Sequence, residues 1–123
     1  MSKKILIAED ETPMANALRL KLEHSGYEVS IAGDGEEAVR LLSDGHFDLA
    51  LLDLVMPKKD GFSVLAFLQE SKEITTPAIV ASNLGQTEDR GRAESLGAID
   101  YFVKSDISLA DILDKVNNFF SRS

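Results

Sequence analysis

The chain contains no cysteine. This absence excludes disulfide bonds, thiolate nucleophiles and cysteine metal sites, and a reducing cytoplasm is the simplest location for such a protein. No apolar run approaches the ~20 residues of a membrane-spanning helix, and the N-terminal residues do not resemble a signal peptide. We therefore expect a cytoplasmic protein without a membrane span.

Basic residues are also scarce. There are 13 lysines and arginines against 21 aspartates and glutamates, which gives a formal charge of −8. A domain that neutralises DNA phosphates has the opposite balance. We therefore expect no nucleic acid and no anionic membrane as a partner of this chain. The negative charge instead favours solubility, basic partner surfaces and bound cations.

The 123 residues suit one domain, and 44% of them are hydrophobic, which is ordinary for a globular protein. Short apolar runs typical of strands occur at 4–8, 27–32, 48–53, 77–82 and 99–103. Four of these runs are mostly apolar, as in strands that are buried on both faces of a parallel sheet. The run at 27–32 alternates instead, which favours a half-exposed edge strand.

A helical pattern follows each run. Thr12 and Pro13 predict the N-cap and the first turn of the first helix. The other patterns begin near Asp34, after Gly61, at 86–96 and at Ser108. The pattern at 86–96 is polar and the weakest, whereas Ser108 and Asp111 resemble a capping box. Five strand–helix units with right-handed crossovers predict a doubly wound α/β fold, in which helices cover both faces of a five-stranded parallel sheet.

A polar residue stands at or just after the carboxyl end of every mostly apolar run. Glu9 and Asp10 follow the first run, Asp53 and Ser82 end the third and the fourth, and Lys104 follows the fifth. Ligands of an open parallel sheet bind at the carboxyl ends of its strands. We therefore expect these five side chains to lie at the same edge of the sheet.

Carboxylates that share one edge repel one another and raise one another's pKa values. A hard divalent cation resolves this conflict, and Mg²⁺ prefers oxygen ligands. Asp10 and Asp53 could bind it directly, a carbonyl just past Asp53 could supply a third oxygen, and Glu9 could act through water. Lys104 would balance the remaining charge. A carboxylate such as Asp53 can also accept a phosphoryl group, whose oxygens the metal, Ser82 and Lys104 would stabilise.

At these residues the chain resembles a response-regulator receiver domain of two-component signalling, of the stand-alone chemotaxis-regulator type. The resemblance covers essentially all of the chain and rests on an ordered set: Glu9-Asp10, Asp53, Met56-Pro57, Asp60-Gly61, Ser82, Tyr101 and Lys104. It implies a flavodoxin-like strand order of 2-1-3-4-5 and a single receiver domain at 1–123 without an output domain. It also implies a sensor histidine kinase or histidine phosphotransfer protein as partner, and a downstream protein target.

The resemblance further implies a role for each site residue. The magnesium ligands would be Glu9, Asp10, Asp53 and the backbone carbonyl of Val55. Asp53 would be the phosphoacceptor and Lys104 would contact the phosphoryl group, while Ser82 and Tyr101 would form a switch. Such a domain catalyses its own phosphorylation and dephosphorylation. It also changes the surface of its fourth helix, fifth strand and fifth helix in order to bind a target.

Three residues depart from the common pattern of relatives. Glu9 stands where many relatives have aspartate, and its longer side chain is compatible with a water-bridged role. Ser82 replaces the commoner threonine and keeps the hydroxyl. Ser105 stands where relatives usually have a proline after a cis peptide bond. Because a cis bond before serine would cost about 2.5–4 kcal/mol, we expect a trans bond between Lys104 and Ser105.

One alternative function remains open, a receiver-like module that binds partners without phosphoryl turnover. Two other readings of the chain are disfavoured. A haloacid-dehalogenase-like phosphatase would need a second aspartate where Val55 stands, and a flavodoxin would need a Ser/Thr/Gly-rich phosphate loop after the first strand. Incorporation of phosphate from a small phosphodonor would separate the two remaining functions.

Overall fold

The expected strands and helices are present in the computed structural model, which describes residues 2–122. The strands are β1 (Lys4–Ala8), β2 (Glu28–Ala32), β3 (Leu49–Leu52), β4 (Ala78–Ser82) and β5 (Asp100–Val103). The helices are α1 (Thr12–His24), α2 (Gly35–Asp44), α3 (Gly61–Glu70), α4 (Thr87–Ser95) and α5 (Leu109–Ser121). A short 3₁₀ helix, η1 (Lys104–Asp106), follows β5, and no sequence pattern predicts it. Within the described residues, no helix has the length and apolar character needed to cross a bilayer.

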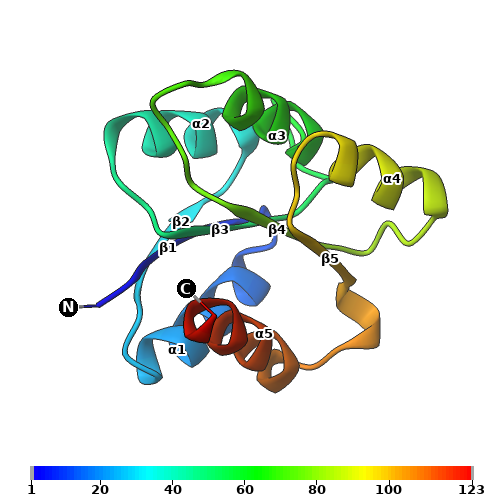
Figure 1. Cartoon of the computed structure of the whole chain (residues 1–123). Coiled ribbons are helices and arrows are strands. Elements are labelled where there is room, and N and C mark those ends of the chain that lie inside the picture. The colour runs from blue at the N-terminus through cyan, green and yellow to red at the C-terminus, as the bar shows by residue number, and fades with distance from the viewer. Residues whose placement is uncertain (1, 123) are drawn as a thin grey trace.

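The strands pair in parallel in the order β2-β1-β3-β4-β5. This order confirms the flavodoxin-like arrangement. Helices α1 and α5 cover one face of the sheet, and α2, α3 and α4 cover the other (Figure 1). Strand β2 lies at an edge and is less buried than β1, β3 and β4, which explains its alternating sequence.

Alternate residues of the central strands fill two separate hydrophobic cores. Leu6 and Leu52 belong to the core beneath α2, α3 and α4. Ile7 and Leu51 belong to the core beneath α1 and α5. Because successive side chains of a strand point to opposite faces, each central strand supplies both cores. Each fully buried leucine or isoleucine stabilises the fold by roughly 1.5–3 kcal/mol. The two cores therefore hold the carboxyl edge of the sheet rigid.

Side-chain caps determine where three of the helices begin. Asp34 and Asp60 accept the backbone N–H groups three residues further on, at 2.8 and 2.9 Å, and so cap α2 and α3. The predicted capping box of Ser108 and Asp111 is confirmed at the start of α5. These caps give an acceptor to backbone N–H groups that have none within the first turn of each helix.

The cap expected at Thr12 is wrong. Helix α1 begins at Thr12, and the residue before it is Glu11, which makes no side-chain cap. The carboxylate of Glu9 accepts the N–H of Glu11 at 3.2 Å, so the turn from β1 into α1 closes one residue earlier than expected. The expected proline in the first turn, Pro13, is confirmed.

Helix α4 is weakly packed, as its polar pattern predicts. Within its bounds Ala93 is the buried residue. Two arginines instead lie over aromatic rings, Arg90 over Tyr101 at 5.0 Å and Arg92 over Phe62 at 4.0 Å from guanidinium carbon to ring centroid. A cation–π contact at an exposed site contributes about 0.5–1 kcal/mol, less than a buried leucine. Helix α4 is therefore suited to move relative to the sheet.

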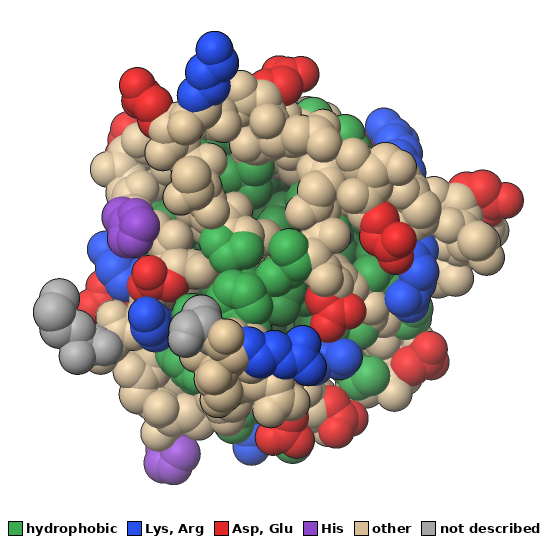
Figure 2. Space-filling model, in the orientation of Figure 1, with side chains coloured by type: hydrophobic (Ala, Val, Ile, Leu, Met, Phe, Trp, Pro, Cys, Tyr) green, Lys and Arg blue, Asp and Glu red, His purple; other side chains and the backbone are tan. Residues whose placement is uncertain are grey.

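The two edges of the sheet differ in character. On the face seen in Figure 2, hydrophobic side chains form the floor of a hollow and charged side chains lie around it. A groove at the amino ends of β4 and β5 is lined by residues that include Leu65, Leu68, Ile74, Pro77, Leu96 and Ile99. The polar residues that follow the strands lie at the opposite, carboxyl edge.

Candidate functional site

Three carboxylates meet at the carboxyl ends of β1 and β3. Glu9 and Asp10 follow β1, Asp53 follows β3, and carboxylate oxygens of the three lie within 4.8 Å of one another. Glu9 and Asp53 are buried, at 5% and 6% exposure, whereas Asp10 is exposed. The structure thus brings these three candidate residues together at the edge where open parallel sheets bind their ligands.

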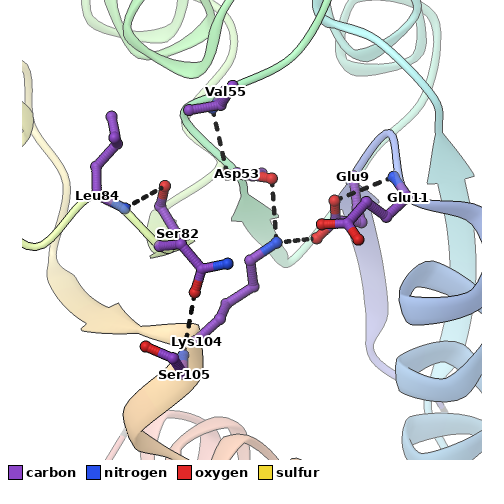
Figure 3. A network of polar contacts seen from close by, with 9 residues as sticks. Glu9, Glu11, Asp53, Val55, Ser82, Leu84, Lys104 and Ser105 are labelled. Carbon is purple, nitrogen blue, oxygen red and sulfur yellow. Dashed lines mark hydrogen bonds and ion pairs between the residues drawn. The ribbon is translucent and has the colours of Figure 1, made fainter.

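Lys104, the first residue of η1, pairs with the two buried carboxylates. Its Nζ donates to Oδ2 of Asp53 at 3.1 Å and also to Oε1 of Glu9 (Figure 3). The other oxygen of Asp53, Oδ1, accepts the N–H of Val55 at 3.2 Å. Asp53 is therefore held on both oxygens. These bonds explain how a carboxylate that follows an apolar strand can be buried without a prohibitive desolvation cost.

Glu9 contacts Lys104 directly, which the sequence did not predict. Burial raises the pKa of Glu9, although the bond from Lys104 acts in the opposite direction. Burial alone would lower the pKa of Lys104, but its bonds to Glu9 and Asp53 raise it overall, so the lysine keeps its charge. The glutamate therefore depends on a neighbouring cation for its own charge.

Ser82 ends β4 beside this cluster and is fully buried, at 0% exposure. Its Oγ accepts the N–H of Leu84 at 3.3 Å (Figure 3). The hydroxyl proton is therefore left to donate to another acceptor. The Ser82 loop borders an open cleft whose lining includes Asp10, Asp53, Val55, Asn83, Leu84 and Lys104.

Tyr101 lies on the α4 side of β5, and its neighbour Phe102 lies on the other side. The ring is 3% exposed, and the hydroxyl donates to the carbonyl oxygen of Leu84. Burial raises the pKa of Tyr101, so the hydroxyl stays a donor at neutral pH. Tyr101 thus links β5 to the loop that follows Ser82. A switch formed by Ser82 and Tyr101 would have to act through this link.

Sequence reasoning missed a second link between these loops. The N–H of Ser105 donates to Oδ1 of Asn83 at 3.1 Å. The peptide bond between Lys104 and Ser105 is trans, as expected, because no cis bond occurs among residues 2–122. An asparagine directly after Ser82 was the available signal, but nothing in the sequence identifies its partner.

The acidic cluster fits a divalent cation. Its donors are all oxygens, which hard ions such as Mg²⁺ prefer, and the exposed Asp10 leaves the cluster open to the cleft. Exposed acidic groups often gather without an ion. Here Lys104 supplies one positive charge to the two buried carboxylates, and Asp10 adds a third carboxylate, so a bound cation would balance the negative charge that remains.

The sequence matches the response regulator receiver domain family over residues 5–117. The "Probable transcriptional regulator ycf27" of Cyanophora paradoxa is 42% identical over 102 residues, which is 83% of this chain and 42% of that protein. The transcriptional regulatory protein CpxR of Escherichia coli strain K12 is 41% identical over 101 residues, which is 82% of this chain and 42% of that protein. The chain therefore spans about two fifths of the length of these curated relatives.

Solved receiver structures have the same fold. The receiver domain of the Francisella response regulator 1452 superposes with a TM-score of 0.89 at 32% identity, over 98% of each chain. The response regulator protein TrrA of Thermotoga maritima, solved with Mg²⁺ and BeF, superposes with a TM-score of 0.81 at 30% identity, over 94% of this chain and 97% of that one. Together with the sheet order and the acidic edge, these matches show that the chain belongs to the response regulator receiver domain family of two-component signalling.

Proposed function

We propose that this domain is a phosphorylation-controlled switch whose acceptor is Asp53. The setting of that carboxylate carries the proposal: it borders an open cleft, pairs with the buried Lys104 and lies beside Glu9 and Asp10. The phosphoryl group comes from a phosphohistidine of a sensor histidine kinase or a histidine phosphotransfer protein.

The transfer forms one bond and breaks another. A carboxylate oxygen of Asp53 attacks phosphorus, and the new O–P bond forms as the N–P bond of the phosphohistidine breaks. The electron pair of the broken bond stays with the leaving imidazole, which takes up a proton from solvent. The N–H of Val55 and the ammonium of Lys104 fix the orientation of the attacking carboxylate.

Residues around Asp53 stabilise the charge of the transferred group. The residues that would hold Mg²⁺ are Glu9, Asp10, Asp53 and Val55 through its carbonyl. The ion supplies positive charge to the phosphoryl oxygens when it is bound. The Oγ of Ser82 accepts the N–H of Leu84, which leaves its hydroxyl proton free to be donated. Ser82 donates this proton to one of the phosphoryl oxygens. The ammonium of Lys104 stabilises another.

The signal leaves the site through the loops around Ser82 and Lys104. The added phosphoryl charge draws these loops inward, and Tyr101 follows because it bonds to the carbonyl of Leu84. Since α4 has little buried apolar surface, the surface of α4, β5 and α5 is the part that changes and binds a downstream protein.

We further propose that the 123 residues act as a single receiver unit that does not itself contact nucleic acid. The formal charge of −8 supports this proposal. The names of the curated relatives describe transcriptional regulators, but those proteins are more than twice as long as the matched segment. A cytoplasmic location remains a prediction from the sequence.

Acetyl phosphate provides the test of the proposed function. With Mg²⁺ present, we expect intact-mass spectrometry to show a gain of about 80 Da, the mass of one phosphoryl group, and we expect EDTA to prevent it. The alternative, a module that binds partners without phosphoryl turnover, predicts no gain in mass under either condition. Absence of the gain with Mg²⁺ would thus favour that alternative.

Val55 and Leu84 should make the phosphorylated state long-lived. Both line the cleft beside Asp53, and Val55 is 57% exposed there. Neither can orient the water that attacks the acyl phosphate. We expect Val55→Asn and Leu84→Glu each to shorten the half-life by roughly tenfold, less than the 10²–10⁴-fold of a fully positioned base, and the double variant to shorten it further. Mass spectrometry after removal of acetyl phosphate measures the decay, and three variants as slow as the parent would exclude apolar shielding as its cause.

A further inference from the structure

We infer that Asn83 is a positioning residue of the phosphoryl site, because its side chain ties the Ser82 loop to the Lys104 turn through the N–H of Ser105. This inference rests on the proposed phosphoryl transfer to Asp53, in which Asn83 has no part so far. The Ser82 hydroxyl and the Lys104 ammonium must both contact the same phosphoryl group, so their loops must hold a fixed relative position.

The bond joins the immediate neighbours of the two groups. Asn83 directly follows Ser82, Ser105 directly follows Lys104, and the Asn83 Oδ1 accepts the Ser105 N–H at 3.1 Å. In Figure 3 the dashed line that ends at Ser105 marks this contact. A displacement of either loop is thus transmitted to the other loop. The bond that transmits it lies one residue from each group that contacts the phosphoryl group.

The N–H of Ser105 needs a partner from outside its own helix. Ser105 lies in the first turn of η1, where backbone N–H groups have no acceptor within the helix. The side chain of Asn83 supplies that acceptor from a different loop, as an N-cap does from the preceding residue. The carboxamide must therefore turn its oxygen toward Ser105, since an N–H can donate only to that end.

A second bond makes the connection rigid. The hydroxyl of Tyr101 donates to the carbonyl of Leu84, so the loop after Ser82 is tied to the chain on both sides of Lys104. Asn83 and Ser105 are both exposed, so packing of their own side chains does not hold these two residues in place. Loops that are already ordered spare the site the entropy cost of ordering them when the phosphoryl group arrives.

Asn83→Ala tests the inference with beryllofluoride and Mg²⁺ as the probe. We expect the apparent affinity to fall about fivefold, which is about 1 kcal/mol at 1.4 kcal/mol per tenfold change and typical of one hydrogen bond. Ser105→Ala is the matched control, because it removes a side chain from the same turn and keeps the N–H. It should bind the probe like the parent.

Hydrogen exchange of the Ser105 amide, followed by NMR, shows whether the bond itself is responsible. We expect about tenfold faster exchange in Asn83→Ala, and protection close to that of the parent in Asn83→Asp, whose carboxylate still accepts. In the background of Ser105→Pro, which lacks the N–H, Asn83→Ala should have no further effect on probe affinity.

Two results would overturn the inference. One is an unchanged Ser105 exchange rate in Asn83→Ala, and the other is faster exchange with unchanged probe affinity. A parent protein that does not bind beryllofluoride at all would instead contradict the proposed function, and the positioning role would be rejected with it.

Discussion

Replacing Asp53 by asparagine should abolish labelling by acetyl phosphate, from a nearly complete gain of about 80 Da in the parent to no detectable gain. The amide has no anionic oxygen to attack phosphorus. The fold should persist, because the amide oxygen can still accept the N–H of Val55 and Lys104 keeps its bond to Glu9. Loss of labelling in this variant would therefore report on chemistry, which far-ultraviolet circular dichroism can verify.

Asp60→Asn is the matched control for this variant. It is the same change seven positions away, in a residue whose carboxylate caps α3 by accepting the N–H of Ser63 at 2.9 Å. Asparagine caps a helix as well as aspartate does, so both the fold and the labelling should be unchanged. If Asp53→Asn is labelled as fully as Asp60→Asn, the acceptor must be another carboxylate of the cluster, and peptide mapping would identify it.

Most of the fold could be predicted because its elements depend on local patterns. A buried parallel strand needs an apolar run, and each run in the sequence became a strand within one or two residues of its expected ends. The start of helix α5 also depends on a local pattern, because Ser108 and the residue three positions later form a capping box that the sequence predicts. The cap of α1 could not be read in this way, because Glu9 closes that turn through a side-chain bond to the N–H of Glu11.

The site could be predicted where position along a strand decides which residues meet. Glu9, Asp53 and Lys104 each follow a strand, so the parallel order of the sheet places all three at the same edge. The direct bond from Lys104 to Glu9 did not follow from that order, because β5 and β1 are not neighbours in the sheet. Contacts that depend on loop conformation were not predictable. The bond between Asn83 and Ser105 forms because η1 presents an N–H that no sequence pattern indicated.

Gly61 is a residue whose role changes once the structure is known. In the sequence, Asp60-Gly61 indicates a turn and a helix cap, and Asp60 does cap α3. Gly61 is required for a different reason: a Cβ atom there would lie 2.3 Å from the carbonyl oxygen of Asp53 and 2.8 Å from Cα of Leu54. Both are backbone atoms, so no side-chain rotation can relieve the clash. The start of α3 is thus packed directly against the segment that carries the proposed acceptor.

Gly61→Ala should consequently destabilise the protein by about 3 kcal/mol, the upper range for overpacking of a buried site, as measured by urea unfolding. Gly91→Ala is the control, because nothing lies within 4 Å of a Cβ added there and alanine favours the interior of α4, so stability should rise by up to about 1 kcal/mol.

The same pair of variants also links packing to chemistry. The clash can be relieved only if the backbone shifts at Asp53 or at Gly61. The backbone of Gly61 is held by its N–H, which donates to the carbonyl of Leu54 at 3.0 Å. Either shift moves the acceptor relative to Lys104, so labelling by acetyl phosphate should slow in Gly61→Ala even at temperatures where the variant is fully folded. A misplacement of about 1 Å can cost 10²-fold in rate, whereas Gly91→Ala should be labelled like the parent. Equal stability and equal labelling of the two variants would show that the loop accommodates a methyl group and that the close approach of α3 does not position Asp53.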